Sequence, residues 1–482
     1  MSHRSTGRLL ALALVAAQLA GCASTASATP GRGSATPAAA GSVAPSAPAS
    51  ARPSPPPASV PGVTPSAAEP TPTISTGPDG IALAMSSASR PTTTPAQATQ
   101  AAAEVNAFGL ALLRRLASGG GNSVISPASI AIALAMARAG ARGETATQMD
   151  AVLHGFGSDA QATGVNALDA SLAALNQVFA QYALGPNAPP EVALQIANAP
   201  FAQRDLALEP AYLDALATRF GAGLRLVDFK ADPDGARRAI NAWVKAQTHD
   251  RIPELLGPPA VTRRTRIALV NTIYLKAPWQ EPFQTQATAP APFTLADGST
   301  VSVPTMAGSY FYPYARGTGW WAVQLPYLGT LALTIIVPDD LAAFSAALTP
   351  AELGRISAAL TPQPIALHLP RIGANTGPVN LTDALAAMGM PIPFDMARAD
   401  FSGITRQEPL YISAVVHQAN IDIDEQGTEA AAATAVLGST GGPGYMGPWR
   451  ELRVDRPFLF ALRDTATGAV LFLGRVTDPS KR

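Results

Sequence analysis

One run of small residues decides how the rest of the chain is read: Asp424-Glu-Gln-Gly-Thr-Glu-Ala-Ala-Ala-Ala-Thr-Ala-Val-Leu437. Alanine has the best helix propensity, so the run could form a surface helix before the glycine-rich segment 438–448. As a strand, it would place small uncharged side chains on one face, namely Thr428, Ala430, Ala432, Thr434 and Val436. A segment that suits both an exposed loop and a buried strand is typical of a conformational switch.

Several other segments carry the same family resemblance as this run. They are Asn122–Ile130, Ala139–Thr145, Leu269–Lys276 with Trp279 and Phe283, Leu325–Tyr327, Met388–Met390, Ala399–Ile404, Arg456–Phe460 and Leu471–Arg475. In this order, and together with the run of small residues, they resemble the serpins, a family of suicide inhibitors of serine proteases. The resemblance covers about residues 98–482.

The resemblance implies an α+β fold in a single domain, with three β-sheets and about nine helices. The hydrophobic periodicity agrees, because helical spacing comes first, as in Phe108 and Leu112, and strands such as Ile267–Leu275 follow later. Length alone would predict two domains, since single cores usually divide beyond roughly 250 to 300 residues. The resemblance covers the whole stretch and favours one domain over two.

The resemblance also assigns positions. It places the hinge of a reactive-centre loop at Glu425, Gly427, Thr428, Ala430, Ala431, Ala432, Ala433 and Thr434. It places a polar cluster under the main sheet, called the shutter, at Ser126, Ser129, Asn271 and His417, and the breach above that sheet at Trp279. Buried hydroxyl, amide and imidazole groups must bond to one another, so the shutter residues are expected to lie together.

The implied function is inhibition of a serine endopeptidase, which cleaves the exposed loop and is trapped as an acyl-ester when the loop inserts into the main sheet. A protein of this kind is consumed and is no enzyme. The small residues after Gly427 favour insertion, and we expect Thr428 to move from solvent into the sheet interior early in that step. Two alternatives remain: a non-inhibitory binding protein on the same scaffold, and an exported hydrolase without a recognisable motif.

The position of the cleaved bond stays open. Counting from Glu425 by the usual family spacing places it at Gly441-Gly442, which few proteases recognise. Counting back from Arg456-Pro457 by shorter family spacings reaches Tyr445 or Met446, which suit an apolar primary pocket. The loop is therefore longer than the family pattern, and the target protease is not determined.

Composition excludes several classes. Lys+Arg and Asp+Glu each number 33, so the charge gives no reason to expect a nucleic-acid partner. Cys22 is the only cysteine, which excludes a disulfide framework in the folded part. We expect no metal, no cofactor and a monomer. The run Arg263-Arg264-Thr265-Arg266 could bind a sulfated polymer, although a solvated loop before a strand is the preferred interpretation.

The N-terminal residues indicate export. Residues 1–21 form a signal peptide, with an apolar run over Leu9–Ala20, and Leu19-Ala-Gly-Cys22 resembles the bacterial lipobox. We expect lipidation of Cys22 and anchoring at the cell envelope or surface, with Ala23 favouring the outer membrane. The alternative is an ordinary signal peptide. Residues 22–97 are rich in Ala, Pro, Ser and Thr and predict a disordered linker or tether before a domain over 98–482.

Overall fold

The computed structural model describes residues 73–116, 121–182, 193–258, 260–375, 377–428 and 447–481. These residues belong to one compact unit of α+β architecture. Within them lie nine α-helices: α1 (Pro95–Leu116), α2 (Pro127–Arg138), α3 (Gly143–Val152), α4 (Ala162–Tyr182), α5 (Pro210–Phe220), α6 (Pro233–Gln247), α7 (Leu341–Ala347), α8 (Pro350–Ala359) and α9 (Thr382–Ala387). The predicted fold class is confirmed.

The first network of strands, which we call the main sheet, carries the candidate site. Its order is β1 (Thr73–Thr76), β2 (Ala82–Met85), β5 (Leu224–Val227), β4 (Ala193–Gln203), β6 (Ile267–Pro278), β15 (Gly427–Thr428), β14 (Val415–Ile423) and β12 (Ile372–Asn375), and β13 (Val379–Asn380) also pairs with β14. Strands β6 and β14 run parallel and pair directly over Leu269–Ile273 and Val415–Ala419. We call the line between them the seam.

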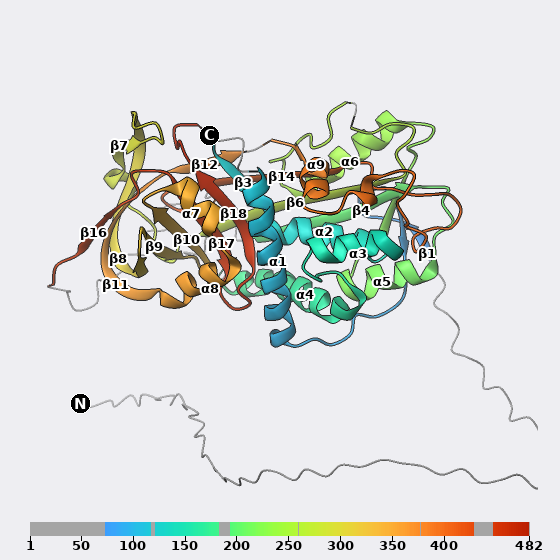
Figure 1. The fold of residues 1–482 in the computed structure, drawn as a ribbon, viewed down its shortest axis with the longest axis horizontal. Coiled ribbons are helices and arrows are strands. Elements are labelled where there is room, and N and C mark those ends of the chain that lie inside the picture. The colour runs from blue at the N-terminus through green and yellow to red at the C-terminus, as the bar shows by residue number, and fades with distance from the viewer. Residues whose placement is uncertain are drawn as a thin grey trace, which may run out of the picture. The chain divides into compact units, whose positions relative to one another are not determined.

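The second network lies beside the main sheet (Figure 1). Its order is β16 (Arg450–Arg453), β11 (Thr361–Pro370), β8 (Thr300–Gly317), β9 (Trp320–Pro326), β10 (Leu331–Pro338), β17 (Phe458–Asp464), β18 (Val470–Val476) and β3 (Ser123–Ile125), with β7 (Ala289–Thr294) on β8. Three sheets were expected. The described residues form two networks, because the 18-residue strand β8 pairs in turn with β7, β11 and β9 and joins what would otherwise be separate sheets.

Helix α2 positions part of the candidate site. Ser126 caps its N-terminus by accepting a hydrogen bond from the Ser129 backbone N–H, and Pro127 occupies the first turn. Every residue of α2 is buried, because the helix packs against β4 and β6 of the main sheet and β18 of the second network. An apolar helix enclosed in this way fixes the positions of Ser126, at its N-cap, and Ser129, in its first turn, beneath the seam.

The folded part begins earlier than predicted. The linker was expected to run to residue 97, yet β1, β2 and the start of α1 precede that boundary. Strand β2 pairs with β5, and Ile81 and Ala84 are buried. Strand β2 lies between β1 and β5, and a short strand of this kind is held largely by backbone hydrogen bonds, so it needs neither aromatic residues nor a strong hydrophobic pattern. In the described ranges, none of the helices has the length and apolar character needed to cross a bilayer.

Candidate functional site

The hinge begins with a tight turn at the end of β14. The Asp424 backbone N–H donates to the Gly427 carbonyl over 2.9 Å, and the Asp424 Oδ1 accepts from the Gln426 N–H over 2.8 Å. Gly427 has a φ of 147°, and a Cβ there would lie 2.1 Å from the Ala277 carbonyl oxygen. Only glycine fits this position, and the turn returns the chain toward the main sheet.

Strand β15 lies between β6 and β14. Thr428 pairs with Ala277 on one side and with Ile423 on the other. Its side chain is 1% exposed, and its Oγ1 lies 2.6 Å from the Tyr327 hydroxyl oxygen. The expectation that Thr428 starts in solvent is therefore wrong. The turn leads straight back into the seam, and Tyr327 satisfies the hydroxyl that would otherwise be buried unpaired.

Trp279, the predicted breach residue, supports this turn. Its ring stacks on Tyr327 with centroids 4.2 Å apart and planes at 21°. The indole Nε1–H donates to the Asp424 carbonyl, and the backbone N–H donates to the Gln426 carbonyl, each over 2.8 Å. Burial raises the pKa of Tyr327, so its hydroxyl stays neutral. Tyr327 lies in a motif that carried the resemblance, but the sequence assigned it no role.

Glu425 anchors the turn from the other side. The residue is 4% exposed, and its carboxylate accepts from the Arg371 Nε and Nη2 over 2.9 and 2.7 Å, and from the Thr288 hydroxyl over 2.5 Å. Burial by itself would raise the pKa of Glu425, but the hydrogen bonds from Arg371 and Thr288 outweigh it and hold the pKa below its ordinary value. Sequence reasoning missed Arg371 and Thr288, and nothing local distinguishes them from other surface residues.

The shutter residues lie at the middle of the seam. The His417 Nδ1 is 2.5 Å from the Asn271 Oδ1, and the Ser126 backbone N–H donates to the His417 Nε2 over 3.1 Å. Because Nε2 must accept, the neutral imidazole carries its proton on Nδ1 and donates it to Asn271. Burial lowers the pKa of His417 to about 3, so the ring is neutral at ordinary pH.

Further bonds join the shutter to α2, β4 and both strands of the seam. The Ser129 hydroxyl donates to the Asn198 Oδ1 over 2.9 Å, and the Asn271 amide donates across the seam to the Val416 carbonyl over 3.3 Å. The structure thus brings together all four residues predicted from the sequence, Ser126, Ser129, Asn271 and His417. Asn198 was missed, since a single asparagine in a strand carries no pattern.

The remaining predicted residues lie outside the described part of the chain. They are Cys22, the hinge residues Ala430, Ala431, Ala432, Ala433 and Thr434, and the candidates for the cleaved bond, Gly441, Gly442, Tyr445 and Met446. After them, β16 pairs in parallel with β11 of the second network.

Comparison with known proteins gives the family. The profile described as "Serpin (serine protease inhibitor)" matches residues 103–479. The chain belongs to the serpin family. Serpins are protease inhibitors rather than catalysts, so this serpin is not an enzyme.

The sequences of its relatives match this serpin over most of its length. Leukocyte elastase inhibitor of Bos taurus is 36% identical over 371 residues, which are 74% of this chain and 93% of the bovine protein. An uncharacterized serpin-like protein of Thermococcus kodakarensis is 34% identical over 379 residues, 78% of this chain and 85% of that protein. The crystal structure of native protease nexin-1 with heparin matches with a TM-score of 0.68 at 27% identity, over 80% of this chain and 100% of that one.

The two strands of the seam are related differently along their length. At the hinge end β15 already separates β6 from β14, whereas below it the two strands pair directly. Opening the rest would break that pairing and the contacts of Asn271 with His417 and Val416. These are neutral hydrogen bonds, which an additional strand between β6 and β14 could replace with its own.

Proposed function

We propose that this serpin inhibits serine endopeptidases by a suicide mechanism, in which the cleaved loop inserts as a strand along the whole seam. The observation that carries the proposal is the position of β15. It lies between β6 and β14, is antiparallel to both, and ends at Thr428, where the hinge continues. An inserted strand would therefore continue a pairing that β15 begins.

Continuing the register of β15 along the seam shows where the hinge residues would lie in an inserted strand. Thr434 lies six positions after Thr428. Because β15 is antiparallel to both neighbours, its partners would be the residues six positions before Ala277 and Ile423, which are Asn271 and His417. In an inserted strand Thr434 would lie between the two shutter residues, where its hydroxyl could bond either of them when their own contact is broken. Ala430 and Ala432 would lie on the same face as Thr434 and add little bulk.

The chemistry belongs to the protease. Its serine oxygen attacks the carbonyl carbon of the scissile bond, the C–N bond breaks, and the new N-terminal amine leaves with a proton from the protease. The acyl-ester then joins the protease to the C-terminal end of the cleaved loop. Insertion gains strand pairing and buried surface, and it moves the attached protease away from the geometry that hydrolysis needs.

The direct test is incubation of the full chain with chymotrypsin-like, elastase-like and subtilisin-like proteases. We expect a complex with the mass of the protease plus this serpin, less the C-terminal peptide that cleavage releases, and we expect it to survive denaturing electrophoresis with at least one of them. Mass spectrometry of the C-terminal peptide then distinguishes cleavage at Gly441-Gly442 from cleavage after Tyr445 or Met446. Complete loop cleavage by every protease without such a complex would contradict inhibition and favour the non-inhibitory alternative.

The insertion step is tested by Thr434→Arg. A guanidinium between Asn271 and His417 would be buried without a counter-charge, at an effective cost of several kcal/mol. The variant should be cut at the same bond as wild type but should form little stable complex. Glu429→Arg is the matched control, since it adds the same side chain at a position that already carries a charge and would face the other side of an inserted strand.

We also propose that the protein is exported and anchored to a membrane by lipid on Cys22. The lipobox-like sequence supports this, and several acyl chains together give stable attachment. Labelled fatty acid should enter the wild-type protein, and Cys22→Ser should release it from membranes or block its maturation. Absence of label in the wild-type protein would overturn the proposal.

A further inference from the structure

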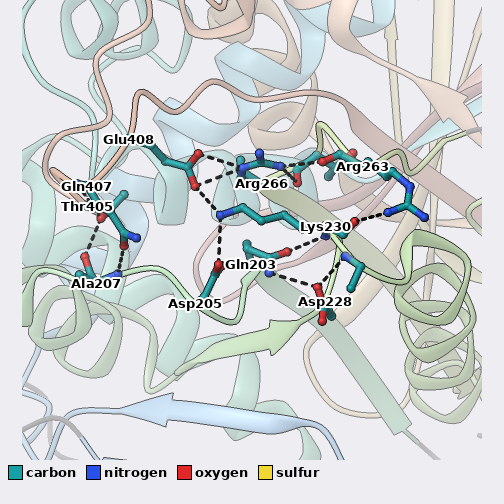
Figure 2. Close-up of polar contacts among 12 residues, drawn as sticks. Gln203, Asp205, Ala207, Asp228, Lys230, Arg263, Arg266, Thr405, Gln407 and Glu408 are labelled. Atoms are coloured by element: carbon teal, nitrogen blue, oxygen red, sulfur yellow. Dashed lines mark hydrogen bonds and ion pairs between the residues drawn. The ribbon is translucent and has the colours of Figure 1, made fainter.

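Charged side chains join the two sides of the seam at the end opposite the hinge (Figure 2). The Glu408 carboxylate lies in the segment leading into β14. It accepts from the Arg266 Nε, with 3.2 Å to each carboxylate oxygen, and lies 3.2 Å from the Lys230 Nζ. Arg266 directly precedes β6, and Lys230 follows β5. We call Arg266, Lys230 and Glu408 the far-end ion cluster.

The cluster is partly buried. The side chains of Arg266, Glu408 and Lys230 are 20%, 28% and 34% exposed. Burial alone would raise the pKa of Glu408, but the hydrogen bonds from Arg266 and Lys230 outweigh it and lower the pKa. Charge-assisted hydrogen bonds between partly desolvated groups are stronger than those of a fully exposed ion pair. The cluster therefore adds to the cohesion of this end of the seam.

Neighbouring contacts engage the same loops. The Gln407 Oε1 accepts from the Ala207 N–H over 2.7 Å, and the Thr405 hydroxyl donates to the Ala207 carbonyl over 2.6 Å. Figure 2 also shows Arg263 bonded to the Lys230 carbonyl. The arginine run considered as a polyanion site thus contributes two of its members, Arg263 and Arg266, to contacts within the protein.

The register of β15 places the cluster in the path of a fully inserted loop. Eleven positions beyond Thr428 is Ser439, and eleven positions back from Ala277 is Arg266. All three candidate sites of cleavage follow Ser439, so a cleaved loop is long enough to reach Arg266. The residues that would arrive there, Gly438, Ser439 and Thr440, carry no charge.

We propose that the far-end ion cluster closes this end of the seam and limits the rate at which a strand can complete its insertion. Completing the strand requires Arg266 on the β6 side to separate from Glu408 on the β14 side, and the incoming residues cannot replace the lost charge. The proposal rests on the proposed function for its role in inhibition, but opening of the seam can be measured without any protease.

The experiment follows the annealing of a synthetic peptide with the sequence of residues 429–441, which begins where β15 ends, to the full-length protein. The peptide carries a fluorophore, and its anisotropy reports the rate of binding. Glu408→Gln keeps the shape of the side chain and removes its charge. Because hydrogen bonds to charged groups are worth more than neutral ones, we expect annealing on the order of tenfold faster in Glu408→Gln than in wild type.

Asp205→Asn is the matched control. Asp205 lies 3.1 Å from the same Lys230 Nζ, but it follows β4, so the pair does not involve the β14 segment. Its annealing rate should equal that of wild type. Added salt screens ion pairs, so the wild-type rate should rise with ionic strength and the Glu408→Gln rate should rise less. The salt series on wild type tests the cluster without any substitution.

Equal annealing by wild type and Glu408→Gln, an equal acceleration in Asp205→Asn, or no annealing by either protein would overturn the proposal. The proposed function can fail separately. If no protease forms a stable complex but the peptide still anneals faster to Glu408→Gln, the proposed role of the cluster stands and the proposed inhibitory function fails. If complexes form and Glu408→Gln anneals like wild type, inhibition stands and the cluster has no such role.

Discussion

Different interactions cross the seam at its two ends, since the Glu425–Arg371 ion pair at the hinge joins only residues next to β14 and β12. At the hinge end, Thr428 lies between β6 and β14 and is held by backbone pairing and a neutral bond to Tyr327. At the opposite end, Glu408 joins Arg266 and Lys230 through charge. Neutral contacts can be exchanged for those of a new strand, but an ion pair replaced by Gly, Ser and Thr is lost. In the mechanism proposed above, insertion would therefore begin easily and be slowed at its end.

The largest expected effect comes from breaking the hinge turn with Gly427→Ala. The added Cβ would meet the Ala277 carbonyl at 2.1 Å, and φ at 147° is strained for any other residue. We expect the native state to lose about 3 kcal/mol, because β15 must leave the seam. The midpoint of urea unfolding measures the loss.

Gly298→Ala controls for backbone strain alone. Gly298 also has a positive φ, of 83°, but a Cβ there would have no neighbour within 4 Å. Its unfolding midpoint should fall less than that of Gly427→Ala. Equal effects would show that close packing of the hinge against β6 is unimportant.

An intermediate effect is expected from His417→Ala, at the middle of the seam. The substitution leaves the Asn271 Oδ1 and the Ser126 N–H buried without their partner. We expect a loss of about 2 kcal/mol at pH 7, within the usual range for an unsatisfied buried group. Urea unfolding of both proteins checks this.

The same pair of proteins tests the protonation state of His417. Its pKa in the folded state is about 3, below the 6.5 of an exposed histidine. Between these two values of pH, the unfolded chain binds a proton at His417 that the native state does not bind. Native stability conferred by a neutral His417 is present above about pH 6.5 and is lost toward pH 3, at up to roughly 1.4 kcal/mol per pH unit. The difference in the free energy of unfolding between wild type and His417→Ala should therefore be smaller at pH 5 than at pH 7. An equal difference at the two pH values would contradict a neutral buried imidazole.

The smallest expected effect is that of Tyr327→Phe, which keeps the stack on Trp279 and removes only the hydroxyl contact with Thr428. We expect a loss of about 1 kcal/mol. Hydrogen exchange at the Thr428 amide should accelerate while exchange in β10 stays unchanged. Unaltered exchange at Thr428 would mean that backbone pairing alone holds the hinge end closed.

Sequence patterns determined the parts of this protein that depend on local chemistry. Ser126-Pro127 starts α2, and Asp424 with Gly427 makes a turn that no other residue at position 427 could form. The resemblance to the serpins added the fold and the shutter, whose residues are far apart in the chain and would not have been grouped by spacing alone. The α+β class followed from the order of helical and strand patterns.

Only the tertiary structure decided where those parts meet. The burial of Thr428 depends on Tyr327, and the pairing of Glu425 with Arg371, or of Glu408 with Arg266, joins residues separated by 54 and 142 positions. Strand β2 was missed because a four-residue strand between β1 and β5 is held mainly by the backbone groups of its two partners. A residue's own neighbours in sequence set its turn or cap, whereas its burial and its charge partner are set by segments that folding brings beside it.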